Sequence, residues 1–390
     1  MKHTQQKAGN RNCTKRNTMR KTITAAALAL MAATATAQEK KSSWTDHIKA
    51  SGFVTTQYQY TGKEGAEGNS FGMRFFRLTL DGRIGRDFYW KTQAQLNGNT
   101  SSLSLSPRMV DMFVEWQRLP SMCVKVGQFK RPFSFENPLH PIDQGFMGYS
   151  QAVMALAGFS DRTGEHSSNG RDIGVQLQGD LLKNAAGRPL LHYQAGVFNG
   201  QGINTGDVDQ RKDIIGGFWI MPVKGMRIGA FGWEGSYARK GTWTEDGVQR
   251  SGVRSLPRHR YAISADYATA GWTFRAEYIH STGKAFSKTL QDADGPEASD
   301  CTLSAKNAKA DGWYAAVIAP IVEGKLYAKA RYDTYRNQAD WASAHTNYEA
   351  GLNWIPCKGI HTSIEYVRVN DRTAAQHNYD MVDAQLSFRF

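Results

Sequence analysis

The sequence predicts an all-β protein, a transmembrane antiparallel up-and-down β-barrel of about 16 strands. From residue 47 onward, segments of about ten residues alternate between apolar and polar positions, as barrel strands do. Short and long connections alternate between these segments. No stretch contains the roughly 20 consecutive apolar residues of a membrane-spanning helix. A mean hydropathy of −0.52 agrees with a barrel, whose strands need apolar residues at every second position only.

The chain begins with a predicted targeting segment. Residues 1–37 are expected to be an upstream extension followed by a secretory signal peptide, with Arg20 and Lys21 before an apolar run from Ile23 to Met31 and a small-residue cleavage site. Residues 38–46 are predicted to be a short periplasmic segment, and residues 47–390 the barrel. Without the leader's seven basic residues, 41 basic face 35 acidic residues, so the net charge falls from +13 to +6. No basic cluster with a nucleic-acid-binding module is present.

The strands are predicted from their two faces. In "FYWKTQAQLN", residues 88–97, Phe, Trp, Thr, Ala and Leu alternate with Tyr, Lys, Gln, Gln and Asn, so one face suits lipid and the other water. A soluble β-sandwich also alternates, but its strands are shorter on average. The predicted strands are residues 47–60, 71–84, 86–97, 107–118, 122–129, 171–182, 188–199, 211–222, 225–239, 258–269, 271–282, 310–320, 323–336, 345–355, 358–370 and 378–390.

The connections predict an orientation in the membrane. Tight turns such as "PVKG" and "PCKG" alternate with longer connections, of which residues 130–170 are the longest, while 240–257 and 283–309 are also expected to be outer loops. An even strand count places both ends on the periplasmic side, with the last strand closing against the first. The final stretch "VDAQLSFRF" ends on Phe390, and it resembles the signal by which the barrel-assembly machinery recognises such proteins.

Three stretches, "VKVGQFKRPFSFEN", "GRDIGVQLQGDL" and "AGVFNGQGIN", resemble the phosphate-selective porins O and P, a Gram-negative outer-membrane family. The resemblance covers about Ala50 to Phe390. It implies a homotrimeric porin in outer-membrane lipid, without a cofactor, whose long third outer loop folds into the lumen and whose basic side chains draw small anions such as phosphate through.

The segment 130–170 is the predicted constriction, because a barrel of sixteen strands encloses more space than side chains fill. Its stretch from Phe146 to Phe159 is too apolar for a loop in water, so we expect it to pack on the inner wall. The alternative is a loop that folds over the mouth as a lid.

Seven basic residues are candidates for lining the channel and binding anions. Lys125 points inward if Val124 and Val126 face lipid, and Lys130 and Arg131 leave the fifth strand where the chain turns inward, unless they form a solvated strand end. Arg74, Arg77, Lys329 and Arg331 are further inner-wall positions. The predicted inner face also carries acidic residues, which leaves selectivity for phosphate open: Glu115, Glu277, Asp333 and Glu365.

Other chemistry has little support. The histidines lack metal-binding spacing, the Ser, His and Asp in "HSSNGRD" are close only in sequence, and "DADGPEASD" lacks the spacing of a calcium loop. Three cysteines remain in the mature chain without a CxxC motif. The sequence therefore predicts a passive outer-membrane channel for small anionic solutes, with phosphate and polyphosphate as candidates, and no enzyme. The alternatives are a weakly selective general porin, a plugged barrel that serves as an adhesin, and a barrel hydrolase.

Overall fold

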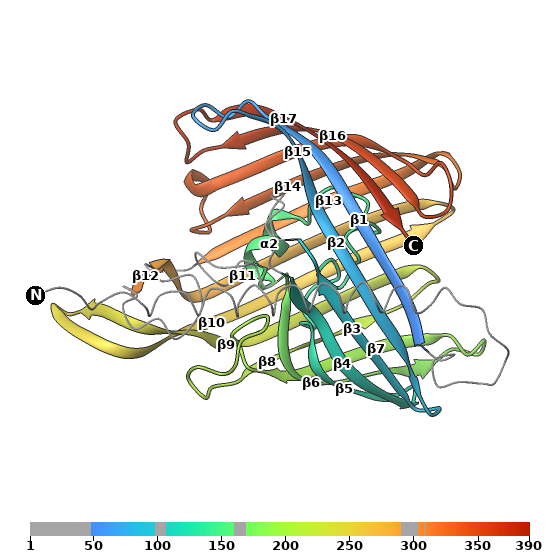
Figure 1. Cartoon of the computed structure of the whole chain (residues 1–390), viewed down its shortest axis with the longest axis horizontal. Helices are drawn as coiled ribbons and strands as arrows, with labels where there is room; N and C mark the ends of the chain where they lie inside the picture. Colours follow the sequence, from blue (N-terminus) through green and yellow to red (C-terminus); the bar gives the residue numbers. More distant parts are fainter. Residues whose placement is uncertain (1–47, 98–106, 160–168, 290–302, 308) are drawn as a thin grey trace, which may run out of the picture. The chain divides into compact units, whose positions relative to one another are not determined.

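The computed structural model describes residues 48–97, 107–159, 169–289, 303–307 and 309–390. In this part of the chain, sixteen antiparallel strands form a closed barrel, and one short strand, β12, pairs beside them (Figure 1). The predicted leader and the segment 38–46 lie outside the described residues. The predicted antiparallel barrel of sixteen strands is confirmed.

The strands follow the chain in order around the wall, with a short helix and a 3-10 turn in the connections. The elements are β1 (Ile48–Thr61), β2 (Gly68–Ile84), β3 (Phe88–Gln95), β4 (Arg108–Leu119), β5 (Met122–Lys130), α2 (Gln151–Leu156), β6 (Arg171–Lys183), β7 (Pro189–Phe198), β8 (Asp213–Ile220), β9 (Met226–Glu245), β10 (Val248–Thr269), β11 (Trp272–Thr289), β12 (Leu303–Asn307), β13 (Ala310–Val322), β14 (Leu326–Arg336), η2 (Trp341–Ser343), β15 (Ala344–Trp354), β16 (Ile360–Asp371) and β17 (Asn378–Arg389).

The barrel closes where β17 pairs with β1, in a register that runs from Phe53 opposite Arg389 to Thr61 opposite Met381. Outside the stretch that pairs with β12, β11 pairs directly with β13, so the wall is also continuous between β11 and β13. Closure pairs the backbone polar groups of the wall strands with one another, as an apolar surrounding requires. None of the described helices is long and apolar enough to cross a membrane.

The two faces of the wall have the chemistry that the alternation predicted. Large apolar side chains such as Ile214 and Phe218 are exposed on the outer face. Polar side chains such as Gln95 and Gln176 lie on the inner face and are buried. This reverses the arrangement of a soluble protein, and it gives lipid an apolar surface and the lumen a polar one.

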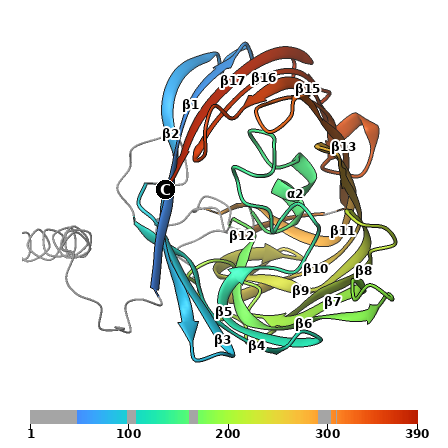
Figure 2. The ribbon, with the colours of Figure 1, turned by 90° about the vertical axis from the view of Figure 1, so that its right-hand side faces the viewer.

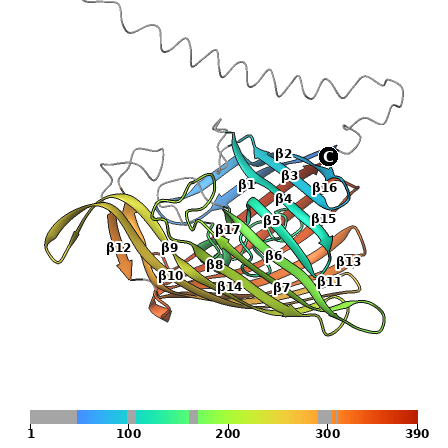
Figure 3. The same cartoon turned by 90° about the horizontal axis from the view of Figure 1, so that it is seen from below.

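One connection differs from its expected form. Residues 240–257 are not a loop, because β9 continues to Glu245 and β10 begins at Val248, and the two strands pair as far as their turn (Figure 3). Asp246 and Gly247 make that turn with φ values of 52° and 76°, as in the type I′ hairpin that favours Asp-Gly. β9 pairs with β8 only as far as Glu234, and the hairpin extends beyond that residue. The hairpin therefore has no face toward lipid that would require an apolar residue at every second position.

A second expected loop also contains strands. Within residues 283–309, β11 continues to Thr289 and pairs there with β12. A small apolar cluster of Tyr237, Leu256, Phe286 and Leu303 joins this extension to the β9–β10 hairpin. The extended strands therefore form two neighbouring pairs, β9 with β10 and β11 with β12, whose apolar side chains pack together beyond the wall.

Candidate functional site

The connection between β5 and β6 folds into the barrel. Viewed along the axis, α2 and the chain around it lie inside the ring of strands (Figure 2). Its apolar side chains are buried against inner-wall aromatics in one core cluster, which includes Phe133, Val153, Phe159, Phe231 and Trp233. The prediction that the loop enters the lumen and packs on the wall is confirmed, and the lid alternative is wrong.

Carboxylates of the wall and of the loop itself fix the backbone N–H groups of the loop. Glu277 of β11 accepts hydrogen bonds from the backbone N–H groups of Phe135 and Glu136, at 2.9 and 2.7 Å. Asp333 of β14 accepts one from Gln151 at 2.9 Å. In the same way, Glu365 accepts one from Met147 at 2.6 Å, and Glu136 accepts one from Ser150 at 3.0 Å.

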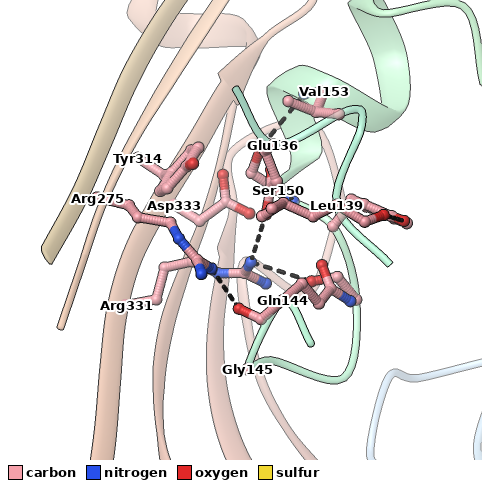
Figure 4. A network of polar contacts seen from close by, with 12 residues as sticks. Glu136, Leu139, Gln144, Gly145, Ser150, Val153, Arg275, Tyr314, Arg331 and Asp333 are labelled. Carbon is pink, nitrogen blue, oxygen red and sulfur yellow. Dashed lines mark hydrogen bonds and ion pairs between the residues drawn. The ribbon is translucent and has the colours of Figure 1, made fainter. Parts of the chain in front are cut away.

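Basic side chains of the wall hold the carbonyl groups of the same loop. Arg331 donates to the carbonyl oxygen of Gly148 at 3.0 Å, and Lys329 donates to that of Gly145 at 3.0 Å. Figure 4 shows Arg275 and Arg331 reaching from the wall to the loop, where Arg275 contacts the carbonyl oxygen of Gln144. Because carboxylates bind the donors and basic groups bind the acceptors, this side of the loop is fixed along its backbone.

Three of the seven candidate residues take part in this attachment. Arg74 donates to the carbonyl oxygen of Met147. Lys329 also contacts Glu365, and Arg331 pairs with Glu349 and Glu136. The structure therefore places Arg74, Lys329 and Arg331 on the inner wall with the loop as their partner. Arg74 is the extra residue at a register shift of β2, between Met73 and Phe75.

Two further candidates lie at the base of the loop. The ammonium of Lys130 donates to the carbonyl oxygens of Asn137 and Leu139, at 2.6 and 2.8 Å, and to the hydroxyl of Tyr149 at 3.0 Å. Arg131 forms an ion pair with Asp172 of β6 at 2.9 Å, and its side chain is 0% exposed. Because its side chain is fully buried, Arg131 anchors the loop and presents no surface to a solute.

The last two candidates, Arg77 and Lys125, line a cavity of about 330 Å³ between the loop and the inner wall of β2 to β7. Six basic residues form its surroundings: Arg77, Lys91, Lys125, Lys130, Arg131 and Arg171. The carboxylates paired with them are Asp111, Glu115 and Asp172. Basic residues therefore outnumber acidic ones among the lining residues and the carboxylates paired with them.

Lys125 is the basic residue of the cavity whose ammonium is held least tightly. Its nearest carboxylate oxygen, on Glu115, is 3.7 Å away, longer than a normal hydrogen bond. The ammonium lies over the rings of Phe113 and Phe129, 5.0 and 5.4 Å from their centroids. The side chain is 17% exposed in a cavity that Gln176, its cross-strand neighbour, also lines.

Several lining residues were absent from the sequence-based candidates. The alternation of residues 88–97 already placed Lys91 on the inner face, and Lys91 forms an ion pair with Asp111 at 2.9 Å. Arg171 shares the same carboxylate at 2.6 Å. The stretch "GRDIGV" did not reveal this ion pair, because Asp111 lies 60 residues before Arg171 in the chain.

The two described cysteines, Cys123 and Cys357, are free.

A closed antiparallel barrel whose lumen is narrowed by an inserted loop is the architecture of an outer-membrane porin. Residues 48–196 match the model of the phosphate-selective porin O and P family, which confirms the predicted resemblance over this part of the chain. No curated protein matches the chain.

Solved structures of outer-membrane proteins share the fold at low identity. The anion-selective porin from Comamonas acidovorans has a TM-score of 0.60 at 15% identity, over 88% of this chain and 99% of its own. The outer-membrane channel DcaP of Acinetobacter baumannii has a TM-score of 0.58 at 13% identity, over 88% and 97%. OmpT of Vibrio cholerae, without its loop L8, has a TM-score of 0.58 at 10% identity, over 88% and 99%. The fold and the matched family are those of channels.

Proposed function

We propose that the protein conducts small anions across the outer membrane by passive diffusion through the cavity between the loop and the wall of β2 to β7. The observation that carries this proposal is that basic residues outnumber acidic ones in the lining of that cavity. Fixed charge acts strongly there, because low-dielectric walls concentrate its field on a permeating ion. The name of the matched family and the anion-selective porin of the same fold support the same direction.

The zero-current potential in planar bilayers tests this proposal. Across a tenfold KCl gradient the wild type is expected to show anion preference, and Lys125→Glu should shift the potential toward cations. The shift should be larger at 0.1 M than at 1 M salt, because the screening length falls from about 10 Å to about 3 Å. Lys358→Glu, a change of the same charge in the exposed turn after β15, should leave the potential unchanged.

The alternatives give different results in the same experiment. A wild type without ion preference would favour a general porin, and a folded protein without conductance would favour a plugged barrel that serves as an adhesin.

For the assembly, we propose a homotrimer in outer-membrane lipid. The support is the exposed apolar outer face and the trimer form of the outer membrane protein OmpT from Vibrio cholerae, which has the same fold at a TM-score of 0.54 and 11% identity.

A further inference from the structure

The lining of the cavity indicates which anions it takes, given the proposed function above. We infer that the preferred solutes are organic carboxylates with a flat apolar part, such as aromatic carboxylates, and that inorganic phosphate is a poor solute. Three features of the cavity carry this inference: its engaged basic groups, its aromatic floor and the free amide oxygen of Gln176.

Three basic residues of the cavity, Lys130, Arg171 and Lys91, already donate hydrogen bonds to protein acceptors. All three ammonium donors of Lys130 have protein acceptors. Arg171 donates to both carboxylate oxygens of Asp111 and to the carbonyl oxygen of Asn169. Lys91 donates to Asp111 at 2.9 Å. A desolvated phosphate needs several converging donors to replace its water, whereas a carboxylate paired with a single ammonium needs fewer.

The available ammonium, that of Lys125, stands over an aromatic floor. Phe113 and Phe129 pack edge to face at 6.0 Å, and Phe129 packs against Phe198 at 5.6 Å. Of these rings, Phe113 is only half-buried, and both Phe113 and Phe129 line the cavity. A carboxylate bound to Lys125 therefore brings the rest of its molecule against a ring face or edge.

Glycines behind the rings make room for this floor. Phe113, Gly127, Gly174 and Phe198 face one another in register across β4 to β7. A Cβ atom at Gly127 would lie 2.2 Å from the carbonyl oxygen of Met112, and one at Gly174 would lie 2.5 Å from the Phe198 ring. Only hydrogen fits at these two positions, so the wall recedes where the rings lie and leaves room for an apolar surface beside Lys125.

Gln176 adds a polar requirement next to the ammonium. It is 3% exposed and stands directly opposite Lys125 in the register of β5 and β6. Its amide nitrogen donates to Gln178 at 2.6 Å, and its buried amide oxygen has no partner among the described residues. That oxygen repels the oxygens of a phosphate and accepts a hydrogen bond from a hydroxyl group, which an aromatic carboxylate often carries.

The test measures how benzoate, acetate and phosphate reduce the chloride current of the wild-type channel in planar bilayers at pH 7. We expect half-reduction at a benzoate concentration about fivefold below that of acetate or phosphate, from the ring contact. Equal concentrations for benzoate and acetate, or a lower one for phosphate, would overturn the inference. A wild type that prefers cations would instead refute the proposed function, so the two failures are distinguishable.

Substitutions test whether benzoate contacts the ring of Phe113. Phe113→Ser should bring benzoate and acetate within about twofold of each other, because the exposed ring is lost. Phe218→Ser removes the same side chain from the outer face, where Phe218 is 56% exposed, and should keep the full preference. Unchanged preference in Phe113→Ser would overturn the assignment to this floor. If Phe113→Ser does not fold, Phe113→Leu retains apolar volume, and the wild-type comparison of the three anions decides the solute class without any variant.

Discussion

Arg331 of β14 and Glu349 of β15 form a two-point ion pair on the inner wall, with hydrogen bonds of 3.0 and 3.1 Å. The same guanidinium donates to the carbonyl oxygen of Gly148 in the loop, at 3.0 Å. Both charged side chains are buried. The pair therefore joins two neighbouring wall strands and the loop at one point, and its loss affects both the wall and the lumen.

Arg331→Gln should destabilise the protein and loosen the loop, because it leaves Glu349 buried without its partner. Removing one partner of a buried pair costs about 3 kcal/mol or more. We expect a lower unfolding temperature in detergent and noisier single-channel currents. Arg368→Gln is the matched control: its ion pair with Asp380 lies on the outer face, 46% exposed, and both readouts should stay at wild-type values. Equal effects of the two substitutions would contradict the anchoring role of Arg331.

Glu277→Gln should release the part of the loop nearest β11. The carboxylate accepts hydrogen bonds from the backbone N–H groups of Phe135 and Glu136, and from the hydroxyls of Ser264 and Tyr314. A glutamine has one accepting oxygen, so at least one buried donor loses its partner, at a cost of about 1–3 kcal/mol. Protease cleavage within residues 131–159 should become faster. Glu234→Gln, on an exposed pair with His259, should be cleaved at the wild-type rate.

His140 should make loop attachment sensitive to acid. Burial, and then the positive charge of Arg389, lowers the pKa of His140 from 6.5 to about 3. The neutral ring contacts Arg389 at 3.1 Å, beside Asp143. Because the folded pKa is the lower one, this contribution to stability is complete above about pH 6.5 and is lost as the pH falls toward 3.

The measurement for His140 is the unfolding temperature at pH 7 and pH 4. His140→Gln keeps a hydrogen-bond acceptor but does not titrate, so the variant should lose less stability than the wild type between these two values. An identical decrease in both proteins would show that other groups control the acid sensitivity.

The wall of the barrel was predictable because each strand has one lipid face and one lumen face. The even and odd positions of residues 88–97 predicted that Lys91 points inward, and the same reasoning placed Lys125 correctly. The β9–β10 hairpin was missed because its outer part has no lipid face, although Asp246 and Gly247 were a direct turn signal.

The roles of the inner charges were not predictable, since their partners are distant in sequence. Arg131 finds Asp172 only because β5 and β6 are neighbours at the two ends of the loop. Arg331 binds a loop carbonyl 183 residues away. Alternation gives the direction of a side chain, but the path of the loop through the lumen decides whether that charge holds the loop or faces a solute.

The most direct test of the central claim, that anions cross between the loop and the wall of β2 to β7, is the single-channel chloride conductance of Gln194→Trp. Gln194 of β7 lines the cavity, and Ala195 beside it is exposed on the outer face. We predict that Gln194→Trp lowers the conductance at least about twofold by filling the passage, while Ala195→Trp conducts like the wild type. Wild-type conductance in a folded Gln194→Trp channel would contradict the account, because the current would then cross elsewhere.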